Sequence, residues 1–381
     1  MPSKAFEVID EGVVARRDPR APWPVAVGPR ACVLGDGSLL CGYSVQTAVG
    51  SNDFAVTLSR SSDGGRSWQN AGSVWPHLEA TQSIAANVSR SPDGELFLYG
   101  IAIPIDEPGE SFWSDATRGI KQNELVWARS SDDGRTWTDP QVIPRDMPGS
   151  VEAPGPLCVT RAGRWFGCYA PYPTFDPMPQ LDRQQIVAVS SADRGGQWTC
   201  QSALRFDEAD STGAEAWVVE LSDGRLAAAC WHMSGGTEGA SANVDYPNKF
   251  ALSSDGGLTW GPTTSTGTMG QSPGLAPLAD GRLLMAYNQR RQEPAGVRLA
   301  LATPTPTDFG LQADELVWQA SRATRSDSAG DHSEWTDFAF GEPAPLPLPD
   351  GSVLVVFWCV QPDGRGAERP GVGYVRVAME P

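Results

Sequence analysis

Three glutamates occupy equivalent positions in the sequence, and their spacing indicates a cluster of carboxyl groups that could do acid–base chemistry. Glu152, Glu215 and Glu342 each precede the glycine of a short turn by nine to eleven residues. Bringing three acids together is costly unless cations, protons or a ligand offset their charge. Such a cluster can supply a general acid and a base or nucleophile for glycoside hydrolysis. We therefore predict these three glutamates as catalytic residues, together with Asp337, which precedes the last of these turns on the same side.

Six short turns position these glutamates, and each turn separates two apolar runs. Asp-Gly or Ala-Gly between such runs favours a hairpin, because glycine adopts positive φ at little steric cost. A third apolar run, such as FAVTLSR at 54–60, follows each of the first five hairpins, and a fourth segment completes each unit. Units of about four antiparallel strands have the size of a propeller blade. The turn glycines are Gly37, Gly94, Gly163, Gly224, Gly281 and Gly351. The sequence thus predicts an all-β, six-bladed β-propeller spanning 1–381 as a single domain.

The last unit is one strand short, since the chain ends soon after its third run, GVGYVRVAM. The N-terminal segment FEVIDEGVVAR lies before the first hairpin and has no partner in the first unit. We expect residues 5–16 to form the outer strand of the last blade. This pairing closes the ring and protects strand edges that are otherwise exposed.

Strand alternation places a pocket at the end of the ring opposite the glycine turns. Starts of first strands and ends of second strands meet there, and His232 ends the second strand of the fourth unit. We predict His232 as a further catalytic residue, with a packed core histidine as the alternative. Arginine binds anionic or hydroxyl groups and aromatic rings stack on sugars, although solvated arginines and core tryptophans are equally natural. The predicted substrate-binding residues are Arg290, Gln271, Asn288, Tyr172, Trp217, Trp231 and Arg30.

A second phrase recurs as SSDGGRSW, SSDDGRTW, SADRGGQW and SSDGGLTW. Its aspartates are Asp63, Asp132, Asp193 and Asp255, and we interpret them as architectural, because Asp accepts backbone N–H groups within its own turn. The phrase resembles the Asp-box, the bacterial neuraminidase repeat of the sialidase superfamily. The resemblance implies a six-bladed propeller with peripheral boxes and a carbohydrate-processing pocket at one end of the axis.

The sequence departs from typical sialidases where their substrate carboxylate is bound. The superfamily's arginine triad is not evident: Val27 stands where the first arginine belongs, and Arg30 lies three residues further on. We therefore expect a sialidase-like, exo-acting glycoside hydrolase for a neutral or differently charged sugar. The alternatives are a polysaccharide lyase on uronate-containing glycans, with His232 or a tyrosine as base, and a non-catalytic carbohydrate-binding propeller.

Charge and composition exclude other classes. The net charge of −17, with lysine only at Lys4, Lys121 and Lys249, disfavours nucleic-acid binding. No apolar run of membrane-spanning length occurs, so we expect a cytoplasmic protein without membrane contact. Seven cysteines without CxxC spacing predict neither a metal site nor a disulfide framework, and no cofactor is expected. Two cysteine pairs flank hairpins, Cys32 with Cys41 and Cys158 with Cys168. We predict that all four are reduced thiols. The sequence gives no signal of oligomeric state.

Overall fold

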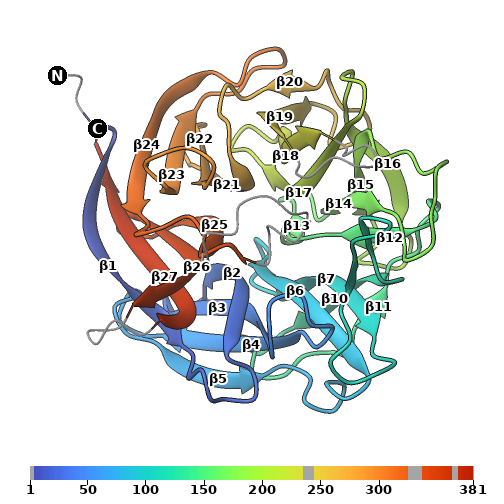
Figure 1. Ribbon diagram of the computed structural model, residues 1–381. Helices are drawn as coiled ribbons and strands as arrows, with labels where there is room; N and C mark the ends of the chain where they lie inside the picture. Colours follow the sequence, from blue (N-terminus) through green and yellow to red (C-terminus); the bar gives the residue numbers. More distant parts are fainter. Residues whose placement is uncertain (1–3, 235–243, 325–336, 363–367, 381) are drawn as a thin grey trace.

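Six antiparallel sheets stand in a ring around a central axis in the computed structural model of the chain (Figure 1). The structure describes residues 4–234, 244–324, 337–362 and 368–380, and these contain strands and turns but no α-helix. Each predicted hairpin forms the two inner strands of a blade, because apolar residues on both sides of its turn pack against neighbouring sheets. The prediction of a six-bladed β-propeller is confirmed.

The strands follow one another from the axis outward. Blade 1 holds β2 (Val25–Val33), β3 (Leu39–Gln46), β4 (Ala55–Ser61) and β5 (Gln69–Ser73). Blade 2 holds β6 (Gln82–Arg90), β7 (Leu96–Pro104), β10 (Glu124–Ser130) and β11 (Gln141–Val142). Blade 3 holds β12 (Ser150–Glu152), β13 (Cys158–Val159), β14 (Trp165–Tyr172), β15 (Gln185–Ser191) and β16 (Thr199–Arg205). A small hairpin, β8 (Trp113–Ser114) with β9 (Gly119–Ile120), lies in the segment between β7 and β10.

The second half of the ring repeats this order. Blade 4 holds β17 (Ser211–Glu220), β18 (Leu226–Ser234), β19 (Asp245–Ser253) and β20 (Thr264–Ser265). Blade 5 holds β21 (Gln271–Pro277), β22 (Leu283–Gln289), β23 (Gly296–Ala302) and β24 (Leu311–Gln319). Blade 6 holds β25 (Phe340–Pro347), β26 (Val353–Pro362), β27 (Glu368–Met379) and, outermost, β1 (Phe6–Arg16).

The first strand of the chain closes the ring, as predicted. Strand β1 pairs with β27 from Phe6 opposite Met379 to Arg16 opposite Gly371. Arg376 on β27 also donates a hydrogen bond of 3.1 Å to the carbonyl of Gly64 in blade 1. Backbone pairing and a side-chain bond therefore both secure the closure.

Large side chains fill the space between neighbouring blades. Tyr43, Tyr99, Tyr169 and Tyr287 occupy the second strands of four blades and are almost completely buried. Their rings pack between sheets. Close packing leaves little room: a Cβ on Gly167 would lie only 2.4 Å from the Tyr99 ring.

All seven cysteines are free thiols. Cys32 lies opposite Leu40 and Cys41 opposite Ala31, so the two are one register step apart. Since neighbouring residues of a strand point to opposite faces, their side chains do not meet across the hairpin. None of the described residues forms a helix with the length and apolar character needed to cross a membrane.

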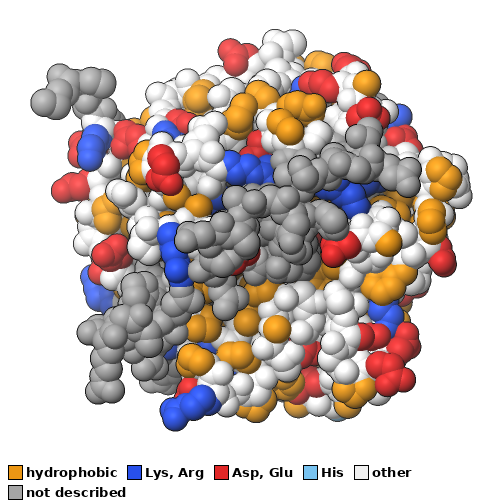
Figure 2. Space-filling model, viewed as in Figure 1, with side chains coloured by type: hydrophobic (Ala, Val, Ile, Leu, Met, Phe, Trp, Pro, Cys, Tyr) orange, Lys and Arg blue, Asp and Glu red, His pale blue; other side chains and the backbone are white. Residues whose placement is uncertain are grey.

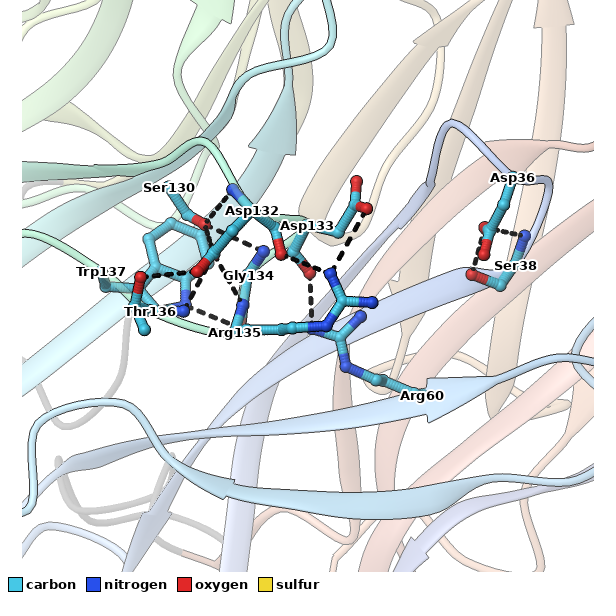
Figure 3. A network of polar contacts seen from close by, with 10 residues as sticks. All are labelled: Asp36, Ser38, Arg60, Ser130, Asp132, Asp133, Gly134, Arg135, Thr136 and Trp137. Carbon is cyan, nitrogen blue, oxygen red and sulfur yellow. Dashed lines mark hydrogen bonds and ion pairs between the residues drawn. The ribbon is translucent and has the colours of Figure 1, made fainter.

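The repeated aspartate phrases lie between the third and fourth strands of blades 1 to 4, where their aspartates stabilise the turns by hydrogen bonds. In the second copy, Asp132 Oδ1 accepts the N–H groups of Arg135 and Thr136 at 3.0 and 2.9 Å, and Oδ2 accepts the Thr136 hydroxyl at 2.6 Å (Figure 3). Hydrogen bonds from Thr136 hold the pKa of this carboxyl well below its usual range. The carboxylate is thus occupied by its own turn, and the architectural interpretation is confirmed.

Replacing Asp132 by Asn is expected to lower the free energy of unfolding by about 1–2 kcal/mol, because a charged acceptor of several hydrogen bonds becomes a neutral amide. Denaturant unfolding measures the change. Asp133→Asn is the matched control: Asp133 adopts φ of 58°, which Asn tolerates, and its carboxylate points to solvent beside Arg135. Equal destabilisation by both substitutions would contradict the role of Asp132.

Candidate functional site

Irregular inner strands shape the centre of the ring. In four blades the first strand has two residues without a partner in the second strand, and the first of these two has positive φ. The positive-φ residues are Gly28, Glu215, Ser272 and Glu342. Bulges of this kind bend a strand and redirect a side chain. Proline follows three of the four, and its missing N–H suits a position outside the ladder. The bulges therefore turn Glu215 and Glu342 toward the axis.

Blade 3 reaches the same result through a break instead of a bulge. Its inner strand is divided into β12 and β13 by residues 153–157, so this blade has five strands where four were expected. Pro154 and Pro156 lie in the break and cannot donate to a ladder. Glu152 is the last residue of β12, directly before this interruption.

A cavity of about 300 Å³ lies at this end of the axis and is lined by residues of all six blades. The three predicted glutamates line it, so the structure brings Glu152, Glu215 and Glu342 together. Apolar and aromatic side chains form much of the remaining wall. Among them are Phe54, Phe112, Trp113, Tyr172, Trp231, Phe338 and Trp358.

Two of the three glutamates are each held by a backbone N–H of the next blade. Glu152 of blade 3 accepts the N–H of Glu215 in blade 4 through Oε2 at 2.8 Å. Glu342 of blade 6 accepts the N–H of Gly28 in blade 1 in the same way, also at 2.8 Å. In both cases the donor is the positive-φ residue of the next blade's bulge. The bulges therefore have two roles. Their side chains bring Glu215 and Glu342 to the cavity, and their backbone N–H groups hold the carboxyl oxygens of Glu152 and Glu342.

Burial and mutual repulsion perturb two of these acids. Loss of hydration raises the pKa of Glu152 above its ordinary value, and the neighbouring Glu215 carboxylate raises it further. Burial also raises the pKa of Glu215, while the positive charge of Arg290 opposes this rise. Because each carboxyl disfavours ionisation of the other, the pair holds a proton at a higher pH than isolated glutamates would.

Arg118, Arg290 and Arg291 also line the cavity, and they come from the segment before β9 and from the end of β22. Arg290 donates to Gln271 Oε1 and, at 3.0 Å, to the carbonyl of Phe340, and its guanidinium lies 3.6 Å from the Phe338 ring centre. Arg291 forms an ion pair with Asp245. In Figure 2, groups of basic side chains flank the centre of the face seen along the axis, whereas acidic side chains are mostly peripheral. None of these three arginines lies at the start of an inner strand, which is where the sialidase resemblance places the first arginine of the triad.

Two of the predicted binding residues line the cavity beside Arg290. Tyr172 lies 5.1 Å below the Arg183 guanidinium, and burial raises its pKa well above the ordinary value. Trp231 donates its indole N–H to Asp245 at 2.9 Å, which fixes the ring orientation. Both rings are thereby held at the wall, as a stacking surface for a sugar requires.

The other predicted site residues lie outside the cavity lining. His232 is fully buried between the rings of Phe206 and Tyr246, 3.7 Å from Glu208, and burial lowers its pKa to about 4. Strand alternation explains this position, because Trp231 and Met233 on either side of it face the cavity. The roles assigned to the remaining residues stay predictions. Gln271 and Asn288 lie buried behind Arg290, Trp217 and Arg30 lie buried nearer the opposite end of the axis, and Asp337 precedes the cavity residue Phe338.

Sequence reasoning overlooked parts of the wall. Ser44, Gln46 and Asn87 line the cavity from β3 and β6, and Trp358 does so from β26. Their positions follow from the same counting of strand ends, but their residue types gave no chemical signal. Among the described residues no group of His, Cys, Asp and Glu is arranged to hold a metal ion.

Comparison with known proteins places this geometry in a family. The profile described as BNR repeat-like domain matches residues 37–304, which is more than half of the chain. The chain belongs to the BNR repeat-like domain family. A search of curated protein sequences gives no significant match.

Solved structures share the fold of this BNR repeat-like protein. A protein of unknown function from Dyadobacter fermentans is 16% identical over 100% of both chains, with a TM-score of 0.73. The GH93 α-L-arabinofuranosidase of Fusarium graminearum, solved with arabinobiose, is 15% identical over 98% of each chain, with a TM-score of 0.63. The NanB sialidase from Streptococcus pneumoniae is 13% identical over 99% of this chain and 71% of its own, with a TM-score of 0.60. At these identities the likeness is one of fold.

Proposed function

We propose that this BNR repeat-like protein is a glycoside hydrolase that cleaves a glycosidic bond of an oligosaccharide or glycoconjugate. The observation that carries the proposal is the partly buried pair of Glu152 and Glu215 in the axial cavity, joined by the 2.8 Å hydrogen bond from the Glu215 amide. The arabinofuranosidase and the sialidase with the same fold support it as analogy.

The chemistry follows from the state of the pair. Burial and repulsion favour one protonated and one ionised carboxyl near neutral pH. A protonated carboxyl can protonate the leaving oxygen, and an ionised one can act as nucleophile or activate water. Arg290, beside Glu215, stabilises the ionised form, while Tyr172 and Trp231 offer faces for the sugar. Wall residues from all six blades surround a cavity on the axis, which suits an exo-acting enzyme that takes a terminal sugar.

The lyase alternative receives less support from the cavity. His232, the base it required, is buried between Phe206 and Tyr246 and does not line the space where substrate would bind. Tyr172 does line the cavity, but burial raises its pKa, which opposes formation of the phenolate that proton abstraction needs.

The test is a screen of the purified protein against aryl glycosides and oligosaccharides, including α-L-arabinofuranosides, sialosides and hexosides. Release of the aglycone with a saturated sugar product is expected for at least one class. A product with a new near-ultraviolet absorbance would identify a lyase instead. Binding without cleavage across the panel would overturn the proposal in favour of a carbohydrate-binding propeller.

A further inference from the structure

Arg30 lies beneath the cavity and connects several blades. Its side chain is only 3% exposed, and it borders a second hollow at the opposite end of the axis instead of the glutamate cavity. Its guanidinium donates to the carbonyls of Glu342 at 3.1 Å and Pro154 at 2.9 Å. It also lies 4.8 Å from the centre of the Trp217 ring. One side chain of blade 1 thus contacts blades 3, 4 and 6, the three blades that carry the glutamates.

The backbone contacts of Arg30 are close in sequence to the carboxyl groups. Pro154 follows Glu152 by two residues, in the break of the blade 3 inner strand, where ladder hydrogen bonds are missing. Glu342 is itself the bulge residue of blade 6, and its carboxyl accepts the N–H of Gly28, two residues before Arg30. The bulge of blade 1 therefore holds Glu342 by its carboxyl and by its carbonyl.

The positive charge of Arg30 interacts with the same three glutamates. The groups that interact with it electrostatically are Glu342, Glu215, Glu152 and the Cys41 thiol. All of its hydrogen bonds among the described residues go to backbone carbonyls, so no ion-pair hydrogen bond neutralises it. The other charged or titratable groups that interact with the glutamates are Arg290, Tyr172 and Cys230, and Arg118 and Arg291 line the same cavity.

We propose that Arg30 is the positioning residue of the carboxyl cluster: its guanidinium fixes the backbone that carries Glu152 and Glu342 and provides a buried positive charge beneath all three glutamates. Its consequence for turnover rests on the proposed function, whereas its effect on the carboxyl groups does not. Arg30 was expected to bind substrate, and the present assignment replaces that role, because its guanidinium lies outside the cavity.

The test uses three variants of the full chain. Arg30→Gln removes the charge, and Arg30→Lys keeps the charge but cannot present the planar fork that reaches two carbonyls. Arg376→Gln is the matched control, since Arg376 is also buried and bonds to a carbonyl of another blade, but it lies at the Asp-box face. Titration of ¹³C-labelled glutamate carboxyls by NMR follows the cluster, with Glu152→Gln and Glu215→Gln spectra for assignment. Kinetics on an active glycoside give kcat and KM.

Removal of the charge in Arg30→Gln is expected to move the glutamate titration midpoints upward by about one pH unit. Arg30→Lys is expected to keep the midpoints but lower kcat roughly tenfold or more, with KM nearly unchanged, because positioning is lost and substrate contact is not. Arg376→Gln should change neither.

Unchanged midpoints in folded Arg30→Gln would overturn the proposal, as would a raised KM with normal kcat in Arg30→Lys. If Arg30→Gln fails to fold, wild-type kcat in Arg30→Lys overturns it instead. If the wild-type protein cleaves no glycoside, the proposed function fails, while the NMR titration still decides the role of Arg30.

Discussion

Glu152→Gln and Glu215→Gln are each expected to reduce kcat about 10³-fold on any glycoside that the wild-type protein cleaves. Glutamine has the shape of glutamate and keeps an oxygen that can accept the Glu215 N–H, so the hydrogen bond between blades 3 and 4 can persist. It can neither donate a proton to a leaving group nor carry a negative charge. The loss should therefore appear in kcat, with the fold intact.

The pairing of the two carboxyls sharpens this expectation. Residues that act in one step are not additive, so the double variant should be little slower than the slower single variant. Glu220→Gln is the control, because Glu220 lies on β17 with Glu215 but bonds to the Arg161 amide outside the cavity. Wild-type turnover in either cavity variant would remove that residue from the catalytic pair.

The second large effect concerns stability and pH. A carboxyl whose pKa is higher in the folded than in the unfolded protein binds more protons when folded, so stability falls as pH rises from the unfolded pKa, near 4.5, through the folded one. Burial raises the pKa of Glu152 in this sense. We therefore expect Glu152→Gln to be more stable than wild type at pH 8 by on the order of 2–4 kcal/mol, and nearly equal to it near pH 4.

Denaturant unfolding of both proteins across this pH range measures the difference. Glu7→Gln, at an exposed position of β1, controls for the chemical change itself. A difference between Glu152→Gln and wild type that stays constant from pH 4 to pH 8 would show that Glu152 ionises in the fold as it does in the unfolded chain. The expected result instead identifies a site that reduces stability at neutral pH, as functional sites commonly do.

The repeated parts of the molecule could be predicted from the sequence because their chemistry is local. An Asp-Gly turn between apolar runs specifies a hairpin wherever it occurs, and six of them specify a ring. The Asp-box aspartates likewise bond within their own turns, as Asp132 does. Even the closure by β1 followed from counting strands. The convergence of Glu152, Glu215 and Glu342 followed from the same counting, since it places equivalent positions at one end of the axis.

What the sequence did not reveal depends on small departures from that regularity. Positive φ at Glu215 and Glu342 is unusual for glutamate, and nothing in the residue type announces it. Each bulge, including the one at Gly28, shifts the register by one residue, so positions beyond it, such as Arg30, lie below the cavity. For His232, a single step of strand alternation decides between the cavity and the space beside Phe206. Counting residues from a turn cannot resolve a difference of one or two positions.

The pairing of β1 with β27 also means that the ring cannot close until the end of the chain has been synthesised. At a synthesis rate of about 5–20 residues per second, the first strand emerges on the order of a minute or less before its partner. During that interval β1 lacks its native partner strand, and the ring cannot close at blade 6. The final hairpin does not add one more blade to a finished body. It closes the ring by pairing the two terminal strands with each other.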